Sequence, residues 1–188
     1  MSLATRKQDA RTRAKAVRAG LSADPRDLVR RWPGMEPSAV IAGYWPLGDE
    51  FDTRPLLEHL SRRHTVVLPV TPRDRLQLAF RRWTPGAAME AGPFGTQHPV
   101  GEVGGEQAPA VPDVVLVPLL AWTRAGDRLG YGGGFYDVTL EALRRDNPAL
   151  RAVGVGYHGQ RVDVLPVEDH DQRLDFILTE RGLAATRL

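Results

Sequence analysis

Short apolar runs alternate along the chain with longer segments in which apolar residues recur every three or four positions. The short runs are rich in Val, Ile, Leu and Ala and lie at residues 40–42, 66–68, 114–117, 152–157 and 176–179. Between them, helical periodicity or capping residues mark segments 3–19, 25–32, 56–62 and 138–145. Continuous apolar runs of this length indicate strands buried on both faces of a parallel sheet. The pattern predicts one α/β domain, residues 1–188, with a mainly parallel central sheet and helices on both faces.

Two segments depart from this alternation. Leu76, Leu78 and Phe80 alternate with less apolar neighbours, which predicts a half-exposed strand over 76–81. Residues 84–112 are rich in Gly and Pro and show little periodicity, so we expect a long, partly ordered excursion within the domain.

The run at 114–117 leads into the most unusual stretch of the chain. Residues 128–137 read R-L-G-Y-G-G-G-F-Y-D and stand between a predicted strand and a predicted helix. Successive glycines allow positive φ and let backbone N–H groups form an anion nest, to which a helix N-terminus adds its own donors. Phosphate is the natural occupant, although a glycine-rich surface turn is the alternative. The stretch matches neither the Walker A loop nor the dinucleotide fingerprint.

Asp137 follows this predicted phosphate nest directly. A carboxylate beside a phosphate indicates a cation between them, and magnesium suits a site made of oxygen ligands. The alternative is that Asp137 only favours the positive end of the helix dipole.

The first helix carries two stripes at helical spacing. The apolar stripe is formed by Ala10, Ala14, Val17 and Leu21, and the basic stripe by Lys7, Arg11, Lys15 and Arg18. Because Lys7 and Arg11 lie one turn apart, both can reach a single polyphosphate. A solvated basic face is the alternative.

Composition narrows the class of protein. The chain has 188 residues, of which 42% are hydrophobic and 26% charged, and it contains no cysteine, which excludes disulfides and thiol chemistry. It has no apolar run of membrane-helix length and no signal-like N-terminus, so we expect a cytoplasmic protein without membrane contact. A net charge of +2 with a pI near 9.3 favours anionic partners but does not choose among nucleotide, folate and nucleic acid.

Residues 128–137 resemble the R-L-G-Y-G-G-G-Y-Y-D signature of the 5-formyltetrahydrofolate cyclo-ligase family, also called 5,10-methenyltetrahydrofolate synthetases, with Phe135 replacing a Tyr. Other segments resemble family motifs in the same order. Residues 7–11 are similar to a K-x-x-x-R motif that contacts ATP, and residues 45–53 to a segment whose glutamate helps hold the folate. His98 stands where the family commonly has a glutamate. The resemblance spans residues 7–178.

The resemblance implies an enzyme that cyclises 5-formyltetrahydrofolate to 5,10-methenyltetrahydrofolate with ATP, releasing ADP and phosphate. Phosphorylation of the formyl oxygen would precede attack by N10. Catalytic roles are implied for Lys7, Arg11, Arg128 and Tyr136. ATP contacts are implied for Lys7, Arg11, Arg128, Leu129, Gly130, Tyr131, Gly132, Gly133, Gly134, Phe135 and Tyr136.

The folate contacts implied by the resemblance are Trp45, Glu50, Tyr131 and Gln160, and the implied magnesium ligands are Asp137 and Asp171. Trp45 can stack on the pterin ring and Glu50 can accept from its N–H edge. Each has an alternative: Trp45 can be a core aromatic and Glu50 a solvated loop residue. Asp171 can belong to an acidic surface turn.

Small-molecule substrates, no nucleic acid and a monomer are therefore expected. Two other functions stay open: a family relative that binds a nucleotide or folate without cyclising it, and a nucleic-acid binder that uses the arginine-rich first helix. Against the second, the chain shows no aromatic-plus-basic strand of the RNA-recognition type.

Overall fold

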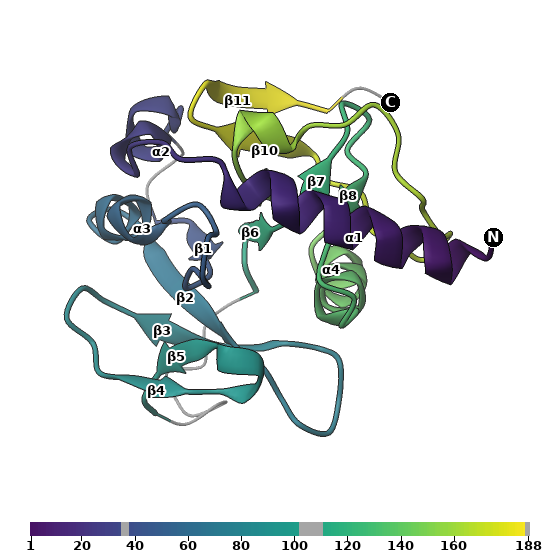
Figure 1. Ribbon diagram of the computed structural model, residues 1–188. Helices are drawn as coiled ribbons and strands as arrows, with labels where there is room; N and C mark the ends of the chain where they lie inside the picture. The colour runs from purple at the N-terminus through teal and green to yellow at the C-terminus, as the bar shows by residue number, and fades with distance from the viewer. Residues whose placement is uncertain (35–37, 102–110, 187–188) are drawn as a thin grey trace.

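The computed structural model describes residues 1–34, 38–101 and 111–186. Its centre is a seven-stranded sheet with the order β11-β10-β9-β6-β1-β2-β3 (Figure 1). The parallel strands are β1 (Val40–Ala42), β2 (Thr65–Val70), β6 (Val114–Pro118), β9 (Arg151–Val155) and β10 (Phe176–Thr179). The antiparallel edge strands are β3 (Ala79–Trp83) and β11 (Gly182–Ala185). The mainly parallel sheet is confirmed.

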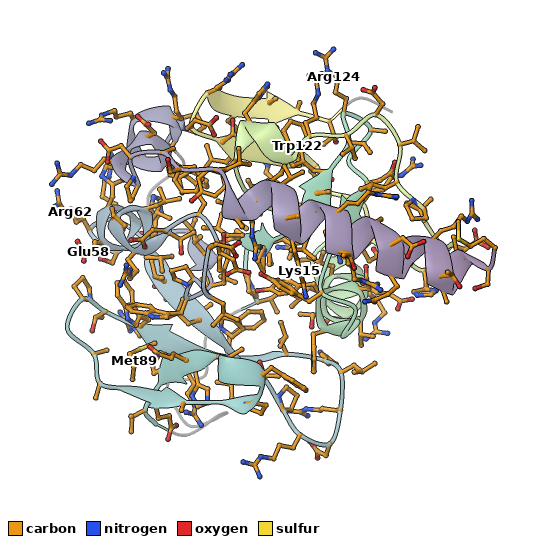
Figure 2. The ribbon with its side chains drawn as sticks, viewed as in Figure 1. Lys15, Glu58, Arg62, Met89, Trp122 and Arg124 are labelled. Carbon is orange, nitrogen blue, oxygen red and sulfur yellow. The ribbon has the colours of Figure 1, made fainter. Side chains whose placement is uncertain are left out.

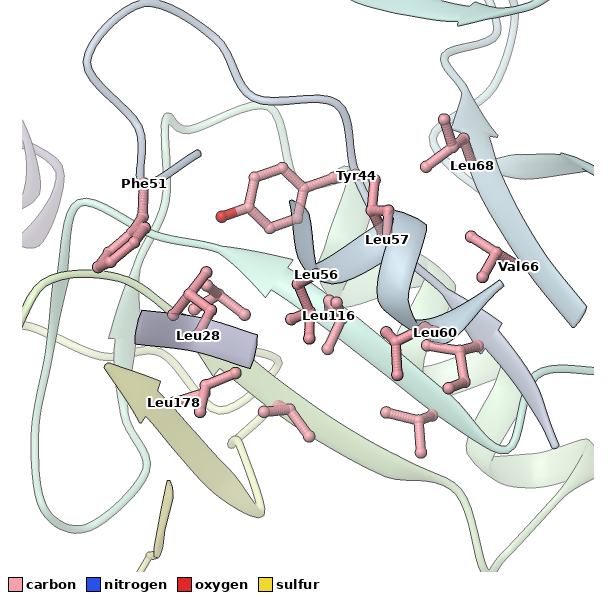
Figure 3. Packing of buried hydrophobic residues seen from close by; sticks show 14 of the residues in the cluster. Leu28, Tyr44, Phe51, Leu56, Leu57, Leu60, Val66, Leu68, Leu116 and Leu178 are labelled. Carbon is pink, nitrogen blue, oxygen red and sulfur yellow. The ribbon is translucent and has the colours of Figure 1, made fainter. Parts of the chain in front are cut away.

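Helices cover both faces of this sheet, as predicted. They are α1 (Leu3–Ala19), α2 (Arg26–Arg31), α3 (Arg54–Leu60) and α4 (Phe135–Asp146). On one face, Leu28 of α2 and Leu56 of α3 pack with Leu116 of β6 in a fully buried cluster (Figure 3). On the other face, Leu140 of α4 packs with Val115 of the same strand. Alternate side chains of β6 therefore enter two different cores, which explains why its run is apolar throughout.

Helix α1 packs outside these two layers. Its Ala14 joins a third buried cluster with Leu120, which follows β6, and with Leu165. Val17, predicted on the apolar stripe, is 50% exposed, whereas the neighbouring Arg18 is only 4% exposed. That part of the prediction is wrong, because at this end of α1 the inner position is taken by Arg18, which lines the cleft and donates to Asp49. None of the helices in the described ranges is long and apolar enough to cross a membrane.

Short elements complete the fold. They are the β4 (Met89–Ala91) and β5 (Gln97–Pro99) pair, the β7 (Ala121–Trp122) and β8 (Arg128–Leu129) pair, and the 3-10 turns η1 (Pro93–Gly95) and η2 (His158–Gln160). The expected excursion at 84–112 thus contains a strand pair, and its residues 102–110 lie outside the described residues. The strand predicted at 76–81 begins only at Ala79. Helix α4 begins at Phe135, earlier than predicted, because Gly134 is its N-cap.

Candidate functional site

A cleft of about 790 Å³ opens where β1, β2 and β6 end, which is where α/β sheets commonly bind ligands. Tyr44 and Trp45 follow β1 into the cleft, Thr71 follows β2, and Pro118 ends β6. The glycine-rich stretch forms another wall. Three basic side chains of α1, those of Lys7, Arg11 and Arg18, face the same space. The cleft is thus built from segments spread over almost the whole chain.

Two glycines of this stretch adopt the positive φ that the sequence predicts. Gly132 and Gly134 adopt φ of 99° and 72°, a region that side chains with a Cβ avoid. Arg11 lies against the loop, and its Nε donates to the carbonyl of Gly130 over 3.1 Å. A Cβ on Gly132 would come within 3.0 Å of the Arg11 guanidinium carbon. The positive φ favours glycine at this position, and an added Cβ would also push the Arg11 guanidinium away.

Lys7 connects helix α1 to the acidic segment that precedes β10. Its Nζ donates to Glu168 Oε2 and to Asp171 Oδ2, each over 2.7 Å. Burial alone would lower the pKa of Lys7, but the hydrogen bonds and charges of the two carboxylates outweigh it and raise the pKa above its usual value. Burial acts to raise the pKa of Asp171, yet the bond from Lys7 holds that pKa below its usual value. Lys7 is therefore a cation held in place by two acids.

Asp137 lies in the first turn of α4 and is paired with Arg128. Its Oδ1 accepts from Arg128 Nη2 over 2.6 Å and from the backbone N–H of Gln172 over 2.9 Å. Arg128 also donates to the carbonyl of Gln172, and its side chain is only 5% exposed. Arg128 and Asp137 together fasten the glycine loop to the segment before β10.

The acidic residues suit a hard cation. Within the described ranges, one group of three possible metal ligands is found, and it consists of Glu168, His170 and Asp171, whose ligand atoms lie within 4.8 Å of one another. Asp137 lines the same cleft but is not a member of this group. Carboxylate oxygens are the donors that magnesium prefers, so the residues fit that ion. Lys7 engages one oxygen of each of two acids, so a metal there would use their other oxygens or displace Lys7 from one of them.

A second set of polar contacts lies around Glu50, which is 8% exposed. The hydroxyl of Tyr131 donates to Glu50 Oε1 over 2.7 Å, and the N–H of Leu47 donates to Oε2 over 2.8 Å. Burial raises the pKa of Glu50, and the two hydrogen bonds oppose it only partly. Each oxygen of this carboxyl group accepts one hydrogen bond within the protein and can accept another from a ligand.

Two cationic side chains of α1, those of Lys15 and Arg18, lie near the ring of Tyr131. The Arg18 guanidinium lies 5.4 Å and the Lys15 ammonium 5.8 Å from the centre of the Tyr131 ring, and Figure 2 shows Lys15 below α1, towards α4. Arg18 Nε also donates to Asp49 Oδ1 over 3.0 Å. Trp45 lies nearby in the cleft lining, with its ring centre 6.2 Å from that of Trp83.

The structure brings together most of the residues singled out in the sequence. Lys7, Arg11, Trp45, Glu50, all of 128–137 and Asp171 line the cleft. Tyr136 lines it while packing against the α4 core, and burial raises the pKa of its phenol. Gln160 does not line the cleft. It is 2% exposed, and its Nε2 donates to the carbonyls of Leu119 and Leu120.

Sequence reasoning missed several residues of this cleft. Arg18 was placed on the basic stripe but given no role, although seven residues after Arg11 puts it on the same helix face. Glu168 was visible only as part of an acidic segment. Phe94 lies in a stretch, residues 93–99, that resembles a family segment, but this residue was assigned no role from the sequence.

Comparison with known proteins gives a consistent result. The model of the 5-formyltetrahydrofolate cyclo-ligase family matches residues 5–180. The chain is 32% identical to the 5-formyltetrahydrofolate cyclo-ligase of Mycolicibacterium smegmatis over 188 residues, covering 96% of this chain and 93% of that protein. It is 36% identical to that of Haemophilus influenzae over 140 residues, covering 73% and 74%.

Two solved structures share the fold. The NMR structure of Aquifex aeolicus 5,10-methenyltetrahydrofolate synthetase superposes with a TM-score of 0.75 at 24% identity, covering 97% of this chain and 93% of that one. The 5,10-methenyltetrahydrofolate synthetase of Mycoplasma pneumoniae gives a TM-score of 0.66 at 22% identity, covering 93% and 98%.

Proposed function

The chain belongs to the 5-formyltetrahydrofolate cyclo-ligase family, and on that premise we propose how its cleft cyclises 5-formyltetrahydrofolate to 5,10-methenyltetrahydrofolate with ATP. One observation carries the proposal. A glycine loop at the N-terminus of α4 faces the cations of α1 across a cleft that also holds the buried carboxyl group of Glu50. The first two features suit a polyphosphate, and the third suits a ligand with N–H donors.

ATP occupies the side of the cleft formed by residues 128–136. The backbone N–H groups of the loop and of the first turn of α4 donate hydrogen bonds to the phosphate oxygens, and Arg11 and Lys7 neutralise their charge. Lys7 reaches the phosphates by exchanging one of its two carboxylate partners, Glu168 or Asp171, for them. Arg128, held by Asp137, contributes a fixed positive charge at the loop.

The folate lies on the Glu50 side. Its pterin ring carries N–H donors on one edge, and these meet the buried carboxyl group of Glu50, whose oxygens each accept only one hydrogen bond from the protein. Trp45 supplies an apolar face for the ring, and Tyr131 connects the two substrates because it belongs to the glycine loop and donates to Glu50. Gln160, which the resemblance implied as a contact, instead supports the wall by holding the carbonyls after β6.

The reaction needs positioning more than it needs a protein nucleophile. The formyl oxygen attacks the γ-phosphorus of ATP, a new P–O bond forms, and ADP leaves. N10 of the folate then attacks the formyl carbon, its proton is released, and the C–O bond breaks to expel phosphate. Burial keeps the phenol of Tyr136 protonated, so it donates a hydrogen bond to developing charge rather than removing a proton.

Magnesium fits this arrangement, with Asp171, Asp137 and the neighbouring Glu168 as the residues that would hold it. When bound, such an ion would neutralise charge on the phosphate oxygens. The cytoplasmic location and monomeric state expected from the sequence stay predictions, to be checked by cell fractionation and by size-exclusion chromatography.

The decisive test follows the absorbance of the methenyl product. Folded protein incubated with 5-formyltetrahydrofolate should form it only when both ATP and magnesium are present, with one phosphate released per ring closed. Unchanged substrate after long incubation would refute cyclisation. Nucleotide binding without turnover would favour the relative that has lost this activity.

A further inference from the structure

A second hollow, of about 690 Å³, lies beside the cleft. The loop between β2 and β3, which extends away from the sheet in Figure 1, forms one side of it. Residues 91–94, at the end of β4 and in the turn that follows it, form the other side. Phe94 and Phe135 line both the hollow and the cleft, so the two spaces adjoin each other at this aromatic pair.

The aromatic pair presents an open apolar surface between the two spaces. The rings of Phe94 and Phe135 lie 5.9 Å apart at an angle of 58°. Phe94 is 78% exposed and adopts a φ of 59°, which is an outlier for a bulky residue. Such backbone strain is concentrated at ligand sites, where the surrounding structure holds a side chain in a required position.

The hollow is also positively charged. Arg73 and Arg75 line it, both are exposed, and within the described residues neither forms an ion pair. Asp74, between them, is the single acidic residue among the lining residues. The loop that carries them is fastened to α4, because the N–H of Leu78 donates to Thr139 Oγ1 over 2.8 Å. The two guanidinium groups are therefore available to an anionic ligand, on a loop whose far end is held at Leu78.

We propose that this hollow binds the glutamate tail of the folate substrate, with Arg73 and Arg75 pairing with its carboxylates and Phe94 packing on the aminobenzoyl ring. The inference rests on the proposed function. A folate carries a pterin at one end, an aromatic ring in the middle and carboxylates at the other end, and each further γ-linked glutamate adds one carboxylate. From Glu50 outwards, the cleft, the aromatic pair and the two arginines offer matching chemistry in the same order.

The test compares 5-formyltetrahydrofolate bearing one glutamate with the same compound bearing three. The double variant Arg73→Ala/Arg75→Ala should raise KM for the triglutamate by about tenfold, equivalent to about 1.4 kcal/mol. It should raise KM for the monoglutamate much less, and leave KM for ATP near the wild-type value. Higher salt should reduce the difference between the two substrates in the wild type. The control is Arg62→Ala, another exposed arginine, labelled in Figure 2, that lines neither space.

The outcomes separate the two proposals. Equal KM changes for both tail lengths, or no change for either, would overturn the tail site while leaving cyclisation intact. A rise in KM for ATP instead would assign the hollow to the nucleotide and also overturn the tail site. Wild-type protein that cannot cyclise the monoglutamate would overturn the proposed function and this inference together.

Discussion

At the scale of single residues, charged side chains in the cleft already have partners in the protein. Lys7 is held by Glu168 and Asp171, Asp137 by Arg128, and Glu50 by Tyr131. Ligand binding at Lys7 must therefore exchange one partner for another, whereas Glu50 can accept further hydrogen bonds beside the one from Tyr131. Such pairs keep each charge stable without ligand, and the two residues of a pair should respond together to mutation.

Asp137→Asn separates a structural role from a metal-binding role. The change removes the charge opposite Arg128, whose side chain is 5% exposed, and should cost about 1–3 kcal/mol of stability because a nearly buried cation loses its partner. If Asp137 also holds magnesium, turnover should collapse and partly recover at high magnesium. Melting curves and turnover across a magnesium titration measure the two effects. Near-normal turnover with an unchanged magnesium midpoint would leave only the structural role.

Glu50→Gln should weaken folate binding without lowering the stability of the fold at pH 7. The pKa of Glu50 is raised above its ordinary 4.5 by burial, so the folded state binds its proton more tightly than the unfolded state. Ionisation of Glu50 therefore destabilises the fold. This destabilisation is absent below pH 4.5 and is complete once the pH exceeds the pKa of Glu50 in the folded state. The variant should be at least as stable as wild type at pH 7, with a flatter acid-side profile and a raised KM for folate.

Denaturant unfolding between pH 4 and pH 8, alongside kinetics, checks this expectation. Glu58→Gln is the matched control, because Glu58 is exposed on α3 and lines no part of the cleft. A Glu50→Gln protein that is less stable than wild type at pH 7, or that keeps the wild-type KM, would contradict the assignment.

At the scale of elements, α1 and the glycine loop work as a pair. Helix α1 is capped by Ser2, whose Oγ accepts from the N–H of Thr5 over 3.2 Å, and Ala14 anchors it to the third core cluster. Its remaining inner surface is basic, so its position depends on contacts with the loop. Arg11 supplies the clearest of them through its bond to Gly130.

Gly132→Ala should impair ATP binding through this pairing. Its backbone φ is 99°, so any side chain costs about 1–2 kcal/mol, and the new Cβ would also displace Arg11, which stands 3.0 Å away. Gly86→Ala is the control, because Gly86 has a φ of 84° but nothing within 4 Å and no place in the cleft lining. Both variants should lose similar stability in melting experiments, and Gly132→Ala alone should raise KM for ATP. An equal KM in the two variants would rule out the Arg11 contact as the cause.

At the scale of the whole molecule, the cleft joins parts of the chain that are distant in sequence. The bond between Lys7 and Asp171 connects residues 164 positions apart, and the loop after β1 meets the glycine loop through Glu50 and Tyr131. A ligand that contacts both sides should therefore stabilise the entire fold and not only its own loop.

Thermal unfolding with ATP and magnesium tests this coupling. At a ligand concentration of about 100 times Kd, binding adds roughly 2.7 kcal/mol, which should raise the Tm of a chain of this size by about 5–10 °C. EDTA should remove most of this shift and abolish turnover, and excess magnesium should restore both. A shift and turnover that persist in EDTA would exclude a required divalent ion.

Much of the fold was predictable because its signals are local. The apolar runs at 40–42 and 114–117 are strands in a parallel sheet, and helices cover both faces. The glycines of 130–134 imposed a turn at the start of a helix that few other residues can form. The boundary errors at β3 and α4 arose where backbone capping and edge exposure, rather than periodicity, decide where an element begins.

The sequence by itself determined the parallel strands, the helices, the positive-φ loop and the order of the motifs, because periodicity and glycine sterics act over a few residues. Only the tertiary structure decided that Arg18 is buried while Val17 is exposed, and that Gln160 faces backbone carbonyls instead of the cleft. It also decided that Arg128 pairs with Asp137 and that Lys7 lies between two acids. Those facts depend on how segments up to 164 positions apart pack together, and no local pattern encodes that packing.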